Sequence, residues 1–300
     1  MKKAARTGLR LVRRLRSRWI DGGLILLYHR IARGGPDPFR LSVSPAHFAE
    51  HLQAVREVAR PIPLRTLVDD LKRGALRVGS VAVTFDDGYS DNLHTALPLL
   101  EAAGVPATVF ALASGPGEEF WWDRLARVLT GWGENGPRRA ARLRREHRRL
   151  APLRPDARAG ALGRLDRGTQ AGAGPAHRAL TVEELRALAD SPLVEVGAHT
   201  HTHPPLDAVD ARRRAWEIAD GGAALAARLG RPVWAFSYPH GAASRAAVRD
   251  VRAAGYACAC GTRADVVWRR SDPLHLPRLW VGDVDGDGLL RLLRGWLRHA

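Results

Sequence analysis

The chain has 300 residues, 45% of them hydrophobic, and a formal net charge of +16 at pH 7. This length and composition suffice for one large α/β domain or two small ones. No run approaches the roughly 20 apolar residues that a transmembrane helix needs. The start of the chain also lacks the apolar core of about 7–15 residues that marks a signal peptide. We therefore expect a cytoplasmic protein.

The positive charge is concentrated in two segments. Residues 1–20 contain eight lysines and arginines and no acid, and residues 131–178 contain twelve arginines and four acids. Each segment carries a charge of +8, so the rest of the chain is formally neutral. The basic character therefore belongs to a tail and to an internal segment.

Residues 1–22 are predicted to form a basic amphipathic tail. Six apolar residues lie between its arginines: Leu9, Leu11, Val12, Leu15, Trp19 and Ile20. This pattern is typical of a helix that binds an anionic membrane surface, which would place the protein at the inner face of the membrane. The alternative is a solvated basic helix. No recognition motif accompanies the charge, so nucleic acid is not an expected partner.

Strand-like and helix-like segments alternate along the rest of the chain. Strands are predicted over residues 24–28, 81–85, 107–112, 194–198, 233–237, 256–260 and 274–281. Helices are predicted over residues 45–59, 93–103, 181–189, 207–229 and 244–254. About seven strands in this alternation indicate an α/β fold with a parallel sheet closed as a barrel.

Residues 23–285 therefore form one predicted domain. Residues 124–179 interrupt its alternation, because they are rich in Ala, Arg, Gly and Pro, and we interpret them as a basic helical insertion in one βα loop. Residues 286–300 are predicted to form an amphipathic C-terminal helix. Cys258 and Cys260 share one face of a strand, where a direct disulfide would be strained, so we expect two small buried thiols and a reducing compartment.

Two polar motifs follow predicted strands. Asp86 and Asp87, in Thr84-Phe85-Asp86-Asp87-Gly88, come directly after an apolar run, and His199 and His203 follow residues 194–198. The carboxyl ends of the strands are where barrel enzymes place their chemistry. Buried carboxylates are costly unless they are paired or bind a metal, and a carboxylate with two imidazoles suits zinc or a neighbouring divalent metal. The motifs predict a metal-dependent hydrolase.

These motifs resemble those of a known family. TFDDG at residues 84–88, HTxxH at 199–203, Tyr-Pro-His-Gly at 238–241 and Leu-Pro-Arg at 276–278 occur in the order typical of polysaccharide deacetylases, the NodB-homology family of carbohydrate esterases. The similarity runs from about residue 24 to about residue 281. It implies a distorted (β/α) barrel and hydrolysis of an N-acetylated glycan.

The resemblance also implies a role for each motif residue. Asp87, His199 and His203 would bind one divalent metal, zinc in the first place, with cobalt, nickel or manganese as alternatives. Asp86 would act as the base that takes a proton from water. His201, between the two histidine ligands, is expected to point away from the metal.

The other implied roles concern the oxyanion, the base and the leaving group. In the segment Tyr238, Pro239, His240 and Gly241, the backbone N–H of His240 would hold the oxyanion. Many relatives carry an arginine near the position of Ser237 that orients the base, and Arg278 is the natural substitute here. His275, or alternatively His29, would protonate the departing amine.

Adjacent tryptophans open the insertion. Trp121 and Trp122 favour packing of the insertion against the core, and the alternative is a platform on which Trp122 stacks against a sugar.

The expected activity is hydrolysis of a carbon–nitrogen bond other than a peptide bond, namely removal of N-acetyl groups from amino sugars of a polysaccharide, oligosaccharide or glycolipid intermediate. The alternatives are deacetylation of O-acetyl esters or non-sugar amides on the same fold, and a non-catalytic glycan-binding protein.

Overall fold

A computed structural model describes residues 22–33, 37–130, 136–166 and 177–297 of the chain. The predicted tail, residues 1–22, lies outside the described residues except for Gly22, so membrane binding by the tail stays a prediction. Among the described residues, none of the helices has the length and apolar character that crossing a membrane requires.

Parallel strands form the central barrel. They are β1 (Gly22–Tyr28), β5 (Ser80–Phe85), β6 (Ala107–Ala111), β7 (Val194–Ala198), β8 (Ala235–Ser237), β9 (Cys258–Cys260) and β11 (Leu279–Trp280). They are hydrogen-bonded in the order β11-β1-β5-β6-β7-β8-β9. Every residue of β1, β5 and β6 is buried, as expected for parallel strands covered on both faces. The predicted barrel of seven parallel strands is confirmed.

The last strand is shorter than predicted. Within residues 274–281, only Leu279–Trp280 pairs with β1, and Leu276 forms a single parallel bridge to Cys260 of β9. Pro277 separates the two pairings, because proline has no N–H to give to a ladder. The segment nevertheless joins β9 to β1 and so closes the barrel, with Arg278 in the middle of the closure.

Short strands that the sequence analysis did not predict complete the sheets. They are β2 (Arg30–Ile31), β3 (Ser42–Val43), β4 (Arg60–Pro61) and β10 (Val267–Trp268). β10 pairs antiparallel with β1, and β4 pairs parallel with β5. Cys258 and Cys260 are free and buried, as predicted.

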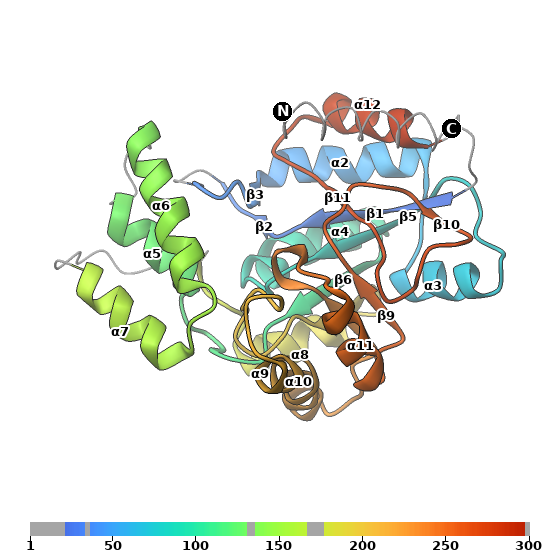
Figure 1. The fold of residues 1–300 in the computed structure, drawn as a ribbon. Coiled ribbons are helices and arrows are strands. Elements are labelled where there is room, and N and C mark those ends of the chain that lie inside the picture. The colour runs from blue at the N-terminus through green and yellow to red at the C-terminus, as the bar shows by residue number, and fades with distance from the viewer. Residues whose placement is uncertain (1–21, 34–36, 131–135, 167–176, 298–300) are drawn as a thin grey trace, which may run out of the picture.

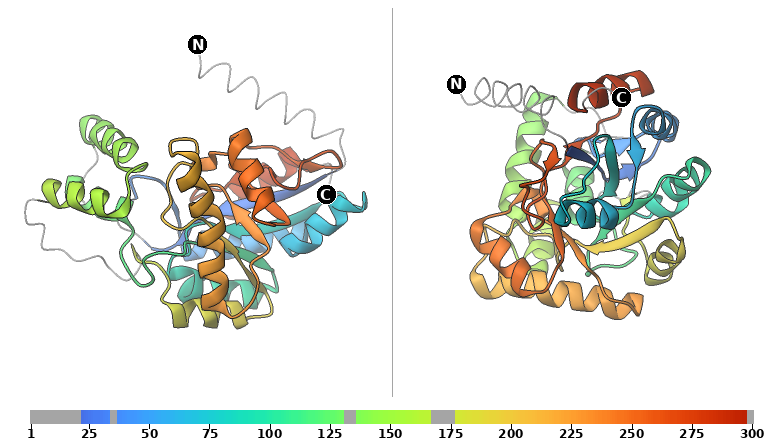
Figure 2. Two further views of the ribbon diagram at one scale, coloured as in Figure 1. Left: turned by 60° about the horizontal axis from the view of Figure 1, so that its bottom comes forward. Right: turned by 90° about the vertical axis from the view of Figure 1, so that its right-hand side faces the viewer.

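Helices surround the strands (Figures 1 and 2). They are α2 (Pro45–Val58), α3 (Leu64–Lys72), α4 (Leu97–Ala103), α8 (Val182–Asp190), α9 (Ala211–Ala215), α10 (Gly221–Leu229), α11 (Arg245–Ala253) and α12 (Gly286–Trp296). Ser44 caps α2 through its hydroxyl, which accepts a hydrogen bond from the His47 N–H at 3.2 Å. The apolar face of α12, with Leu289, Leu293 and Trp296, is buried, and α12 lies alongside α2.

Two predicted helices differ from the observed ones. The helix expected from residue 207 begins at Ala211, because the Asp210 side chain accepts a hydrogen bond from the Arg213 N–H and acts as the N-cap. It then contains a π-helical turn, Trp216–Asp220, before α10. A second π-helical turn, Asn92–Ala96, precedes α4.

The insertion is helical, and it lies between β6 and β7. It consists of α5 (Trp121–Thr130), α6 (Pro137–Leu150) and α7 (Pro155–Leu165), which stand to one side of the barrel (Figure 1). Leu125, Leu143, Leu150 and Leu162 are buried together in a small apolar cluster of their own. The insertion therefore packs as a unit beside the barrel.

Candidate active site

A left-handed turn holds the two acids that follow β5. Asp86 and Asp87 are buried, with 3% and 4% exposure, and φ is 75° at Asp87 and 77° at Gly88. A Cβ atom at Gly88 would lie 2.9 Å from the Cβ atom of Ala111, so glycine is required at this position for space as well as for φ. The turn gives the neighbouring carboxylates different partners.

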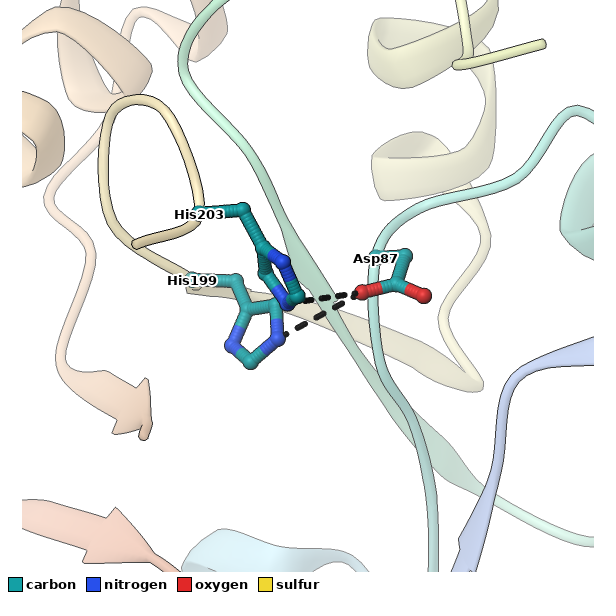
Figure 3. A group of neighbouring side chains, drawn as sticks. All are labelled: Asp87, His199 and His203. Atoms are coloured by element: carbon teal, nitrogen blue, oxygen red, sulfur yellow. Dashed lines mark ion pairs between the residues drawn. The ribbon is translucent and has the colours of Figure 1, made fainter. Parts of the chain in front are cut away.

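The partners of Asp87 are the two histidines that follow β7, His199 and His203. The Asp87 Oδ1 atom lies 3.5 Å from His199 Nε2 and 3.4 Å from His203 Nε2 (Figure 3). One potential ligand atom from each residue lies within 4.8 Å of the others, and all three side chains are buried. The structure thus brings together the three residues predicted to bind a metal.

The hydrogen bonding of His199 shows that this cluster fits a cation. The His199 Nδ1 atom lies 2.8 Å from the carbonyl oxygen of Ser237, to which it donates. Burial opposes a charge on His199, but the charges of Asp86 and Asp87 outweigh it and raise the pKa of His199, so the buried Nε2 atom faces a site that favours a positive charge. A divalent metal supplies that charge in place of a proton, and the carbonyl fixes the ring as ligand histidines require.

Backbone strain is also concentrated here. Besides Asp87, the non-glycine residues with positive φ among those described are Arg40, Thr200, His203 and His240, and all but Arg40 lie around the cluster. The Thr200 hydroxyl accepts a hydrogen bond from the His203 N–H at 3.0 Å and stabilises this loop. Conformations of this kind cost free energy and are typical of functional sites.

His201 lies outside the cluster. Its ring packs 4.4 Å from the ring of Trp216, and its N–H donates to Glu217 at 3.1 Å. The side chain between the two predicted ligands therefore faces away from them, as expected.

The second acid has an arginine as its partner. Arg278, which is completely buried, donates from Nη1 and Nη2 to the two carboxylate oxygens of Asp86 at 2.8 and 2.6 Å. Burial raises the pKa of Asp86, but the charge and hydrogen bonds of Arg278, together with the charges of His199 and His29, outweigh it and hold this pKa at about 2. Asp86 is therefore an anion over the whole neutral range.

Ser237 completes this pair. Its hydroxyl lies 3.1 Å from Asp86 Oδ2 and accepts from Arg278 Nη2 at 2.8 Å. Ser237 thus holds Asp86 through its hydroxyl and His199 through its carbonyl. The sequence analysis considered Ser237 only as the place of a missing arginine, and no spacing rule would have singled out its hydroxyl.

The two candidate proton donors lie in different surroundings. His29 follows β1, and Asp86, Asp87 and His199 are among the groups that act on its pKa, which burial lowers. Its Nδ1 atom is buried and has no hydrogen-bond partner among the described residues. The neighbours of His275 are Gly261 and, at 6.3 Å between ring centroids, Tyr238. The charges of Asp87, Asp86 and His199 therefore act on His29, whereas those that act on His275 belong to Arg263 and Asp272.

The Tyr-Pro-His-Gly segment lies beside the group formed by Asp87, His199 and His203. Pro239–Gly241 form a 3₁₀ turn in which φ of His240 is 56°, and the Tyr238 hydroxyl donates to the Leu274 carbonyl at 2.8 Å. The His240 ring lies 4.6 Å from the ring of His203. Participation of the His240 backbone N–H in binding an oxyanion stays a prediction.

Trp122 is part of the packing behind the ligands. It is 3% exposed, stacks on Phe120 at 4.6 Å between ring centroids, and lies 4.5 Å from the ring of His203. Its N–H donates to the hydroxyl of Tyr89, which in turn donates to Asp123. This is the packing arrangement that the sequence analysis favoured over a sugar platform.

The insertion contributes a histidine to the same region. His147, in α6, stacks 4.9 Å from Trp121 and lies 5.5 Å from His240, measured between ring centroids. The sequence analysis did not identify it, because a single histidine in an arginine-rich helix carries no motif. The insertion therefore reaches the loops of the barrel that carry the metal cluster.

Comparisons with known proteins agree with this geometry. The family model described as polysaccharide deacetylase matches residues 73–259. YxkH of Bacillus subtilis strain 168, named as a polysaccharide deacetylase, is 29% identical over 99 residues, which are 32% of this chain and 33% of the relative. The match thus spans about a third of the length of that relative.

Solved structures show the same fold. The deacetylase PplD of Streptococcus pyogenes, solved in complex with acetate, has a TM-score of 0.65 and 18% identity, covering 92% of this chain and 99% of that one. IcaB of Ammonifex degensii has a TM-score of 0.61 and 20% identity, covering 92% and 97%. The chain belongs to the polysaccharide deacetylase family.

Proposed function

We propose that the protein is a metal-dependent hydrolase that removes N-acetyl groups from amino sugars of a polysaccharide, oligosaccharide or glycolipid intermediate. The observation that carries this proposal is the pair of adjacent acids with separate partners. Asp87 faces two histidines at 3.4–3.5 Å, while Asp86 stays charged beside Arg278. One acid would thus bind a metal, and the other, kept ionised by Arg278, would accept a proton.

Asp87, His199 and His203 would hold the metal, which we take to be zinc, with cobalt, nickel or manganese as substitutes. A divalent ion at this cluster supplies Lewis acidity, which polarises the amide carbonyl and makes water a better nucleophile. Three protein ligands are the number found at catalytic zinc sites.

The residues around the cluster carry out the proton transfers. Asp86 accepts a proton from the attacking water, and its two hydrogen bonds to Arg278 keep the carboxylate ionised and oriented. The backbone N–H of His240, in the loop beside His203, would donate to the developing oxyanion.

We assign protonation of the departing amine to His29 rather than His275. The reason is position: His29 is half-buried, the charges of Asp87, Asp86 and His199 act on it, and its Nδ1 atom has no hydrogen-bond partner among the described residues. His275 packs near Tyr238 and Gly261. Either histidine satisfies the chemistry of the step, and the location distinguishes them.

Acetate release from N-acetylglucosamine oligomers tests the proposal. The protein is stripped of metal, reloaded with zinc or cobalt, and compared with D86N and D87N, with metal content measured in each. We expect metal-dependent release in the wild type. D87N should lose both metal and activity, and D86N should keep the metal while its turnover falls about 10²–10⁴-fold.

Asp69 supplies the matched control, because it begins another Asp-Asp pair, on the exposed surface of α3. D69N should keep both metal and turnover. No acetate release from any N-acetylated amino sugar by the zinc-loaded wild type would overturn the proposal.

A further inference from the structure

Arg158 is a buried cation without an acid of its own. It lies in α7 of the insertion and is 5% exposed. Its Nη2 atom donates to the carbonyl of Thr202 at 3.0 Å, and its guanidinium lies 4.8 Å from the Trp121 ring centroid. Its Nη1 atom is buried and has no hydrogen-bond partner among the described residues. Burial lowers the pKa of Arg158 to about 10, which leaves it charged at neutral pH.

The acid whose charge acts on Arg158 already has other partners. Glu217 is completely buried, lies 3.5 Å from the Nε atom of Arg213, and accepts from the N–H and hydroxyl of Thr202. The attraction of Glu217 for Arg158 is therefore partly offset by the repulsion from Arg213. A buried charge left in this state is expensive unless a ligand compensates it.

The guanidinium lines a cavity of about 260 Å³ at the junction of the insertion and the barrel. Phe120, Trp121 and Trp122 also line it. The indole Nε1 atom of Trp121 is a second buried donor without a partner among the described residues. Aromatic surface with a few converging polar groups is typical of a small-molecule site, and both unpaired polar groups here are donors.

This cavity adjoins the metal cluster. Thr202, whose carbonyl binds Arg158, lines the cavity and directly precedes the predicted ligand His203. Trp122 lines the cavity as well, and its ring lies 4.5 Å from that of His203. The cavity is therefore separated from His203 by the side chain of Trp122.

The acids of the cavity limit the charge of the ligand. Glu119 is paired with Arg127, whose Nε and Nη2 atoms donate hydrogen bonds to its carboxylate at 3.1 and 2.8 Å. Glu118 is exposed and lines the same cavity. Its negative charge opposes a doubly charged phosphate more strongly than a singly charged carboxylate.

We propose that this cavity binds the carboxylate of a sugar acid that neighbours the deacetylated sugar in the substrate, with Arg158 and the Trp121 N–H as its donors. This inference rests on the proposed function, because the sugar acid is defined as the neighbour of the deacetylated sugar. Binding of the carboxylate is measured without the reaction, so the binding site and the proposed function can be disproved independently.

Binding of methyl β-D-glucuronide, methyl β-D-glucoside and inorganic phosphate is measured by calorimetry on the full chain. We expect the glucuronide to bind at least about tenfold more tightly than the glucoside, because a hydrogen-bonded ionic contact is worth at least that factor. R158Q should abolish this preference, and W121F, which keeps an aromatic ring but loses the N–H, should reduce it. Equal binding of the two glycosides, or phosphate binding in preference to both, would overturn the proposal.

Arg164 provides the control, since it lies in the same helix, is exposed and is not among the cavity residues. R164Q should keep the preference of the wild type, and melting curves of all variants show whether each is folded. If R158Q is unfolded, W121F becomes the test. A folded W121F variant that keeps the wild-type preference for the glucuronide would then contradict the proposed carboxylate site. Glucuronide binding without acetate release from any substrate would leave this site in place and remove the proposed function.

Discussion

Arg278 binds both carboxylate oxygens of Asp86 from the segment that closes the barrel. The distances are 2.8 and 2.6 Å, and neither side chain is more than 4% exposed. The Nε atom of Arg278 donates to the Gly261 carbonyl at 2.8 Å, which fixes the guanidinium from the opposite side. The bond between these two residues therefore links barrel closure to the acid that we propose as the base.

Substitution of Arg278 tests this link. R278Q leaves a buried carboxylate without its cation, so we expect unfolding free energy to fall by about 3–5 kcal/mol. The remaining folded protein should show acetate release at least about 100-fold below the wild type, since the proton acceptor loses its orientation. Chemical denaturation and turnover are measured together.

Arg270 is the matched control, because it is exposed and lies outside this network. R270Q should resemble the wild type in both measurements. Full activity and stability in R278Q would show that the bidentate contact does not matter.

Two histidines of the same motif, His199 and His201, are expected to differ in their effect on metal binding. H199A removes a group that faces Asp87, and H201A removes a ring that packs on Trp216. We expect zinc stoichiometry, measured after dialysis, to drop from one to near zero in H199A and to stay at one in H201A. Equal zinc content in the two variants would contradict the assignment of ligands.

Much of this site could be predicted from the sequence because its residues follow strands. In a parallel barrel the strand ends meet, so Asp87 and His199 had to lie close together once the strands were recognised. The hydroxyl of Ser237 and the stacking of His147 depend on how separate loops pack, and a sequence pattern does not report that. Arg158 was counted only as part of a basic segment, since its burial follows from the packing of α7.

The two candidate proton donors can be separated by paired substitutions. H29A should lower acetate release about 10²–10⁴-fold with zinc content unchanged, because the departing amine loses its acid. H275A should keep turnover within a few-fold of the wild type, because His275 is half-buried beside Gly261 and Tyr238. A large loss in H275A together with wild-type turnover in H29A would reverse the assignment.

Glu184 ties the end of the insertion to the barrel domain through α8. Its carboxylate accepts from Arg178 Nη1 and Nη2 at 2.6 and 2.7 Å and from the Thr181 N–H at 2.9 Å in a capping box. The hydrogen bonds from Arg178 are the largest cause that lowers the pKa of Glu184 to about 2.

The lowered pKa predicts how this contribution depends on pH. Because the folded pKa lies below the ordinary glutamate value of 4.5, the stabilisation is complete above about pH 4.5 and is lost as the pH falls towards 2. E184Q should therefore cost about 1–3 kcal/mol of unfolding free energy at pH 7, and the difference from the wild type should shrink below pH 4.5. Urea unfolding at pH 7, 5.5, 4 and 3.5 measures it, with E183Q, at the exposed neighbouring position, as the control expected to change less. A difference that stays constant down to pH 3.5 would show that the charge of Glu184 does not provide the stabilisation.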